Sequence, residues 1–203
     1  MNYELDALRR RFDGHKPGLM GARHMFAVLC PLVEQPDGLH FLFEVRAAGV
    51  RQPGEVCFPG GRAESGESPI DCALRETEEE LSIPRSEITP VGTPDFICNQ
   101  RGFLLHPVLG VVSPAGLAAL RPSPDEVAET FTAPVAFFRD TPPDIYTYTL
   151  QPQIPSGFPY EAIGVSPDYP WSHGKVNVPV LYYQNHAVWG MTARIVQHLV
   201  SEL

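Results

Sequence analysis

The sequence predicts one α/β domain in which a mixed β-sheet lies between helices, an α/β/α sandwich. Three observations support this fold class. Apolar runs of strand character and segments of helical periodicity are mixed along the chain. The length of 203 residues suits one domain with a full core and is short for two. The proline-rich stretch 142–173 has too little periodicity for a second domain, so we expect a long insertion within the fold.

In the N-terminal part of the chain, the residue pattern predicts a helix followed by a hairpin. Leu5, Leu8 and Phe12 recur at helical spacing, which indicates an amphipathic helix over 3–11. The turn signal Gln35-Pro36-Asp37-Gly38 separates two apolar runs and indicates a hairpin. The strands expected in this part are 25–33, 39–46 and 55–58.

A second helix follows the glycine-rich turn that ends near residue 67. Ser68 is suited to be its N-cap, and Pro69 fits the first helical position, where an N–H is not needed. Asp71, three residues after the cap, favours the helix N-terminus. Pro84 ends the helix.

The rest of the chain adds strands and two helices. Short helices are expected at 134–139 and 192–203, the latter because apolar residues recur there at helical spacing. A last hairpin is expected around Gln184 and Asn185. The strands expected here are 88–93, 103–112, 127–131, 176–183 and 187–189.

Composition limits the classes of partner. The formal charge of −9 argues against nucleic acid and acidic membranes, whose phosphates the protein would repel. The four cysteines lack paired metal-binding spacing, so we expect reduced thiols. Neither a hydrophobic signal segment nor an apolar run of membrane-spanning length is present, and the expected location is the cytoplasm.

Three glutamates of the second helix suggest a metal site. Glu76, Glu79 and Glu80 stand at i, i+3 and i+4, so they share one helix face, whereas Glu78 points away. Carboxylates held this close repel one another unless a cation lies between them. Hard oxygen ligands suit Mg²⁺, with Mn²⁺ as a substitute. A solvated acidic face is the alternative that the glutamates alone leave open.

The same segment resembles the Nudix box. That pattern is Gly, five residues, Glu, seven residues, Arg-Glu, an apolar residue, any residue, Glu-Glu, any residue, Gly and an apolar residue. Thr77 replaces its apolar residue, and Ser82 replaces its second glycine. The matching residues are Gly61, Glu67, Arg75, Glu76, Glu79, Glu80 and Ile83.

The resemblance implies a Nudix-type α/β/α sandwich and hydrolysis of a nucleoside diphosphate linked to another group. It implies that the three glutamates hold the metal and that the Gly61 carbonyl adds a ligand. Arg75 lies one turn from Glu79, so an ion pair is expected to orient that ligand, with Glu67 bracing the arginine. Either Glu126 or Glu129 would supply a further catalytic carboxylate, and both remain open.

Residues upstream resemble the signature of the coenzyme A pyrophosphatase branch of this family. The signature is Leu-Leu-Thr, any residue, Arg-Ser/Ala, three residues, Arg, three residues, Gly, three residues, Phe-Pro-Gly-Gly. The chain departs from it at Glu44, where threonine is expected, and has one residue fewer between Arg51 and Gly54. The similarity implies substrate contacts from Arg46, Arg51, Phe58 and Gly60.

The leading hypothesis is therefore Mg²⁺-dependent hydrolysis of coenzyme A to 3′,5′-ADP and 4′-phosphopantetheine, or of its acyl derivatives. Hydrolysis of ADP-ribose or a nucleotide sugar is the neighbouring alternative, which gains if Glu44 and the shortened spacing spoil the coenzyme pocket. A noncatalytic nucleotide sensor is the alternative from another class. The intact glutamate triad speaks against it, because a binding module does not need so many mutually repelling carboxylates.

Overall fold

A mixed β-sheet organises the computed structural model, which describes residues 3–15, 18–21, 24–99 and 102–202. Within these residues the sheet has eight strands in the order β3-β2-β1-β7-β5, with β4 beside β1, β6 beside β7 and β8 beside β2. β1 runs parallel to β7 and antiparallel to β2 and β4. The strands are β1 (His24–Gln35), β2 (Gly38–Arg46), β3 (Val56–Cys57), β4 (Gly60–Arg62), β5 (Ile88–Gly92), β6 (Ile97–Cys98), β7 (Phe103–Val112) and β8 (Val127–Pro134).

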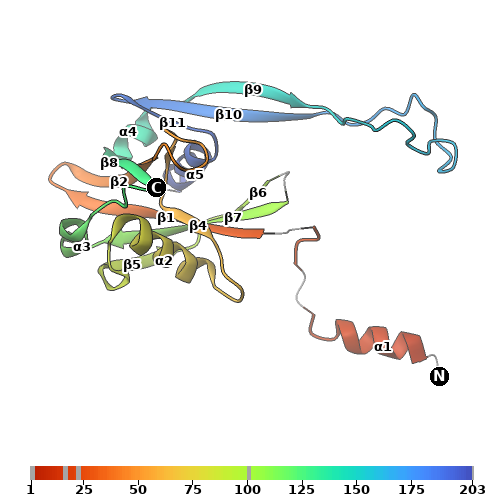
Figure 1. The fold of residues 1–203 in the computed structure, drawn as a ribbon, viewed down its shortest axis with the longest axis horizontal. Helices are drawn as coiled ribbons and strands as arrows, with labels where there is room; N and C mark the ends of the chain where they lie inside the picture. Colours follow the sequence, from red (N-terminus) through yellow and green to blue (C-terminus); the bar gives the residue numbers. More distant parts are fainter. Residues whose placement is uncertain (1–2, 16–17, 22–23, 100–101, 203) are drawn as a thin grey trace.

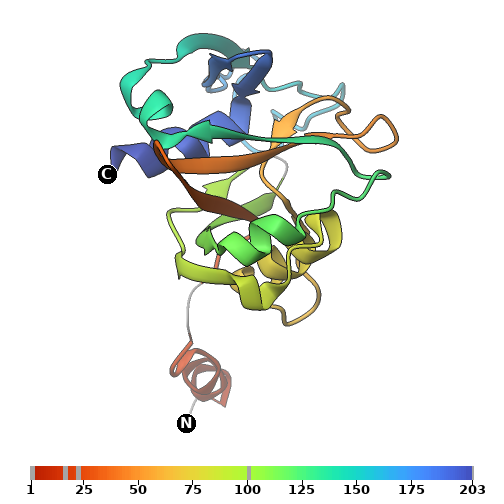
Figure 2. The same cartoon turned by 90° about the vertical axis from the view of Figure 1, so that its left-hand side faces the viewer.

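Helices cover both faces of this sheet, as Figures 1 and 2 show. α2 and α3 lie on one face, and α4 and α5 lie on the other. The predicted α/β/α sandwich is thereby confirmed. The helices are α1 (Tyr3–Phe12), α2 (Pro69–Leu81), α3 (Pro114–Ala119), α4 (Val135–Asp140) and α5 (Gly190–Ser201), with a short 3₁₀ turn at Arg85–Glu87.

Alternation along β1 divides the apolar residues between two cores. Ala27, Leu29 and Val33 belong to the core beneath α2. Phe26 and Cys30 belong to the opposite core, which α4 and α5 close. Successive side chains of a strand point to opposite faces, so a central strand must be apolar on both.

The ends of α2 follow the sequence signals. The Ser68 side chain caps the helix by accepting a hydrogen bond from the Asp71 N–H at 3.1 Å. Ser82 ends it in the left-handed conformation at φ 57°, the role that glycine has in the box pattern. Thr77 is buried, and its hydroxyl donates to the Ala73 carbonyl at 2.7 Å, which satisfies its polar atom inside the core.

The proline-rich stretch 142–173, expected as a long insertion, contains a strand that the sequence analysis did not predict. It begins with β9 (Asp144–Leu150), which pairs with β10 (Gly174–Tyr183). β10 also pairs with β11 (His186–Trp189), so a three-stranded sheet forms beside α5. Figure 1 shows the β9–β10 ribbon extending past the main sheet to the loop that joins the two strands.

The two ends of the chain differ from the prediction in detail. α1 forms as expected and stands apart from the sheet, and its residues Leu8 and Phe12 are exposed. α5 begins at Gly190 and ends at Ser201, and Leu203 lies outside the described residues. None of the helices within the described ranges has the length and apolar character needed to cross a membrane.

Candidate active site

Two glycines at the start of β4 shape the turn that leads toward α2. Gly60 has φ +154°, and a Cβ there would lie 2.3 Å from the Ala27 carbonyl oxygen of β1. A Cβ on Gly61 would lie 2.3 Å from the carboxyl carbon of Glu76. The first glycine is therefore required by the backbone, and the second makes room for a functional side chain.

Alanine substitutions at the two glycines should therefore affect stability and activity differently. Gly60→Ala should destabilise the protein by roughly 3 kcal/mol or more, because both the positive φ and the clash with β1 backbone are costly. Gly61→Ala should leave the fold nearly as stable, because only the flexible end of Glu76 must move. It should nevertheless lower turnover by about tenfold to a hundredfold, since the carboxylate is displaced. Urea unfolding and steady-state kinetics on both variants test this, and equal stability losses would contradict it.

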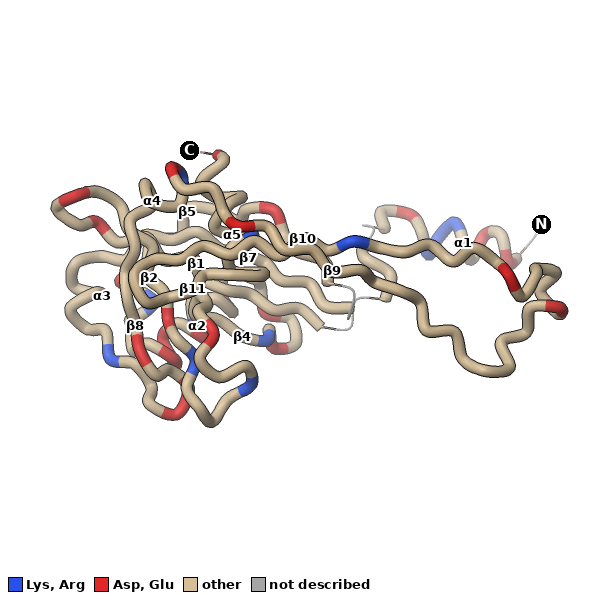
Figure 3. The backbone as a smooth tube through the Cα atoms, turned by 90° about the horizontal axis from the view of Figure 1, so that it is seen from above, with Lys and Arg blue, Asp and Glu red and all other residues tan. Residues whose placement is uncertain are grey.

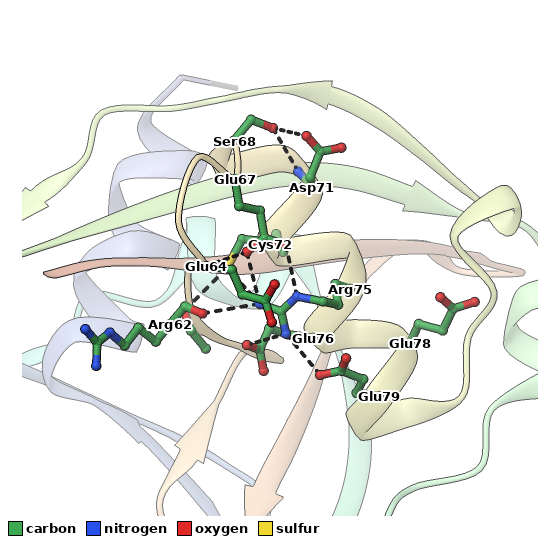
Figure 4. A network of polar contacts seen from close by, with 12 residues as sticks. Arg62, Glu64, Glu67, Ser68, Asp71, Cys72, Arg75, Glu76, Glu78 and Glu79 are labelled. Atoms are coloured by element: carbon green, nitrogen blue, oxygen red, sulfur yellow. Dashed lines mark hydrogen bonds and ion pairs between the residues drawn. The ribbon is translucent and has the colours of Figure 1, made fainter.

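Arg75 is the centre of a polar network on α2 (Figure 4). Its Nε donates to Glu67 Oε1 at 2.9 Å and its Nη2 to Glu67 Oε2 at 3.1 Å, a bidentate pair. Its Nη1 donates both to Glu76 Oε1 at 2.8 Å and to Glu79 Oε2 at 3.0 Å. Hydrogen bonds from Arg75 hold the pKa of Glu67 at about 2. The arginine thus orients two of the three glutamates, and Glu67 in turn orients the arginine.

The three glutamates do not share one environment. The Glu79 side chain is 57% exposed, whereas Glu80 as a whole residue is only 6% exposed. Glu80 Oε2 accepts a hydrogen bond from the Gly60 N–H at 2.8 Å, which ties α2 to the glycine turn. Burial raises the pKa of Glu80, and the charge of Glu44 raises it further. The expected shared face is thus a boundary between core and solvent, with Glu80 on the core side.

Glu44 of β2 joins this cluster, although the sequence reasoning did not assign it a role. It is 1% exposed, and its Oε1 accepts a weak hydrogen bond from the Cys57 thiol at 3.3 Å. Its Oε2 is buried without a hydrogen-bond partner among the described residues. Burial raises the pKa of Glu44. A signal was available in the sequence, because a glutamate interrupts an otherwise apolar strand.

The two candidate carboxylates near β8 lie in different surroundings. Glu129 lies opposite Val45, Val127 lies opposite Arg46, and the register shifts between these pairs. Glu129 Oε1 lies 3.3 Å from His186 Nε2, and its partner Val45 packs in the core that α4 and α5 close. Glu126 precedes the bulge, and its charge raises the pKa of Glu44, Glu76 and Glu80. Glu126 therefore lies within electrostatic reach of the carboxylate cluster, whereas Glu129 lies beside His186.

The predicted substrate-binding residues occupy different depths. Arg46 ends β2 and donates from Nε to the Arg51 carbonyl at 2.8 Å, so the two arginines belong to one loop structure. The Ala47 N–H donates to the Glu126 carbonyl at 2.8 Å and joins this loop to the carboxylate cluster. Phe58 differs from the expectation, because it is 3% exposed and stacks on Phe43 within the core.

The donor set suits a hard divalent cation. Acidic residues group around α2 and the start of β8 in Figure 3. In the described part of the chain, no three His, Cys, Asp or Glu side chains already surround a common point closely enough to hold a metal. Arg75 and the Gly60 N–H hold one oxygen each of Glu76, Glu79 and Glu80, and each carboxylate has a second oxygen. With the unpartnered Glu44 Oε2, these all-oxygen donors fit Mg²⁺ or Mn²⁺.

Comparisons with known proteins agree with this architecture. The family model described as the NUDIX domain matches residues 23–148. The chain is 31% identical over 209 residues to "Uncharacterized Nudix hydrolase NudL" of Cronobacter sakazakii, covering 98% of this chain and 94% of that protein. The Escherichia coli protein of the same name is 32% identical over 184 residues, covering 87% and 81%. The crystal structure of RenU, a Nudix hydrolase from M. smegmatis, shares the fold with a TM-score of 0.50 at 24% identity, covering 58% of this chain and 74% of that one.

Proposed function

Because this chain belongs to the Nudix hydrolase family, whose members act on phosphoanhydride bonds of nucleoside diphosphate derivatives, we propose that its substrate is coenzyme A or an acyl derivative. Hydrolysis of the pyrophosphate would release 3′,5′-ADP and 4′-phosphopantetheine, or its acylated form. The reaction would depend on Mg²⁺, with Mn²⁺ as a substitute.

The observation that supports the substrate assignment is the position of Arg46 within electrostatic reach of Glu44, with Arg51 in the same loop. Arg46 lies at the end of β2, two residues after Glu44, and is bonded to the Arg51 backbone. Its loop is bonded in turn to the backbone of Glu126. Guanidinium groups bind phosphates in a bidentate manner, so these side chains suit the additional phosphate that distinguishes coenzyme A from ADP-ribose.

The chemistry follows from charge. A pyrophosphate is densely negative, and a bound divalent cation supplies charge neutralisation and a more acidic water. Glu76, Glu79 and Glu80 would hold the cation together with the Gly61 carbonyl. Arg75 would orient Glu76 and Glu79 through the contacts already described. Glu126, the carboxylate within electrostatic reach of the cluster, would accept the proton of the attacking water.

Hydrolysis of ADP-ribose or a nucleotide sugar is the second candidate. Two features favour it: the loop from Arg51 to Gly54 is one residue shorter than in the coenzyme A signature, and Glu44 replaces its threonine. Glu44 adds a negative charge two residues from Arg46, which weakens attraction for a phosphate there. A panel of both substrates, with products resolved by chromatography, distinguishes the candidates.

Arg51→Ala tests the coenzyme assignment directly. Losing a charge-assisted contact to a phosphate costs about 1.5–3 kcal/mol, so kcat/KM for coenzyme A should fall roughly tenfold to a hundredfold. The value for ADP-ribose should change little. Arg85→Ala is the matched control, because Arg85 is a surface arginine paired with Glu78 at 3.0 Å. Equal losses on both substrates would indicate a generic pyrophosphate contact and would contradict the assignment to coenzyme A.

A further inference from the structure

We propose that Glu44 is an additional carboxylate ligand of the divalent cation and holds it from the sheet, opposite the glutamates of α2. This inference rests on the proposed function, because it concerns the same cation. It adds a residue that the box pattern does not contain and that stands where the resembled signature has threonine.

The direction of the Glu44 side chain follows from alternation along β2. Leu42 belongs to the core beneath α2, whereas Phe41, Phe43 and Val45 pack in the opposite core. Glu44 is two residues from Leu42 and therefore points to the α2 face of the sheet. Glu80 of α2 accepts from the Gly60 N–H and lies within electrostatic reach of Glu44.

The surroundings of Glu44 leave its carboxylate short of hydrogen-bond donors. The residue is 1% exposed, its Oε2 has no hydrogen-bond partner in the described residues, and its Oε1 receives only a thiol. A thiol is a weak donor. The Arg46 side chain contacts the same thiol, with its Nη1 4.0 Å from Cys57 Sγ. A buried carboxylate oxygen that no donor faces is unusual in proteins and calls for a ligand.

Three separate elements each contribute a glutamate to the cluster of carboxylates around Glu44. Glu44 comes from β2, Glu80 from α2 and Glu126 from the loop before β8, and each is close enough to act electrostatically on another. Like charges gathered from separate elements destabilise the fold, and a bound cation reverses the sign of that interaction. If Glu44 only filled the core, an uncharged residue of similar size would serve equally well.

Manganese binding tests the role without any enzymatic readout. Metal-free protein is titrated with Mn²⁺, and the free ion is followed by electron paramagnetic resonance. Glu44→Gln and Glu44→Thr should each raise the Kd for Mn²⁺ by about tenfold or more. Glu78→Gln is the matched control, because it removes a glutamate charge from an exposed position of α2 that is paired with Arg85. Its Kd should stay within about twofold of the parent.

The outcomes separate this inference from the proposed function. A parent protein that binds no Mn²⁺ would contradict the metal-dependent function itself. A parent that binds Mn²⁺ and a Glu44→Gln variant with the same Kd would overturn only the role of Glu44. Thermal unfolding of the metal-free variants completes the test: both should melt at or above the parent temperature, since an unpaired buried charge is removed. Failure of both variants to fold would show that Glu44 is a structural residue and would also overturn the inference.

Discussion

Exhaustive chelation is expected to abolish pyrophosphate hydrolysis, and addition of Mg²⁺ or Mn²⁺ is expected to restore it. The site gathers Glu44, Glu76, Glu80 and Glu126 within electrostatic reach of one another. Without a cation, these carboxylates repel the substrate phosphates as well as each other. No arrangement of Arg75 corrects this, because its donors are already committed to Glu67, Glu76 and Glu79.

The measurement is phosphate-ester release before and after chelation, followed by titration with each metal. Circular dichroism of the chelated protein serves as the control, since loss of activity must not result from unfolding. The metal should also raise the melting temperature, because a ligand that binds only the folded state stabilises it by mass action. Full turnover by folded, chelated protein would contradict the metal-dependent mechanism.

Glu80→Gln is expected to have opposite effects on activity and on stability. Turnover should fall by roughly a hundredfold or more, as for removal of a key electrostatic group. The metal-free protein should become more stable by at least about 1 kcal/mol, because a buried charge next to Glu44 disappears. The glutamine oxygen can still accept the hydrogen bond from the Gly60 N–H, so the glycine turn keeps its anchor.

The pH dependence of stability follows from the same residue. Burial and the charge of Glu44 raise the pKa of Glu80 from 4.5 to about 8. Between these values the folded protein binds a proton that the unfolded chain has lost. The unfolding free energy of metal-free protein should therefore fall as pH rises from about 4.5 to about 8. Urea unfolding at several pH values in this window measures the slope.

Glu80→Gln should make that slope shallower, and the remaining slope should come from groups such as Glu44, whose pKa burial raises to about 7. Glu78→Gln should leave the slope unchanged. The control removes an exposed glutamate of the same helix, which is paired with Arg85. A slope as steep in Glu80→Gln as in the parent would contradict the assignment of this titration to Glu80. A stability loss in the metal-free variant would show that the Glu80 charge is compensated in the folded protein.

Local sequence signals determined α2 and most of its chemistry. The Ser68 cap and the first-turn proline appear where the sequence places them, and the helix ends before Pro84. Spacing along a helix is regular, so the pairing of Arg75 with Glu79 follows from a separation of four residues. The bracing of Arg75 by Glu67 follows from the box pattern and is observed at 2.9 Å.

Pairing between distant strands determined features that the sequence left open. The sequence does not reveal that Glu129 lies opposite Val45 of β2 and beside His186, or that the charge of Glu126 acts on Glu44, Glu76 and Glu80. The strand at Asp144–Leu150 likewise depends on a partner more than twenty residues away, and the sequence analysis predicted no strand there. Pairing with a distant strand is a tertiary contact that local periodicity cannot encode.

The environment of each carboxylate also depends on tertiary contacts. By sequence, Glu76, Glu79 and Glu80 are equivalent members of one helix face. Packing of α2 against the sheet buries Glu80 and leaves Glu79 in solvent. The same packing brings Glu44 to Glu80 from a strand 36 positions earlier in the chain. Residue types and spacing therefore predicted the carboxylates and the arginine pairing of α2. Only the fold of the sheet against that helix determined which carboxylates lie close together, because burial and charge proximity depend on contacts between distant segments.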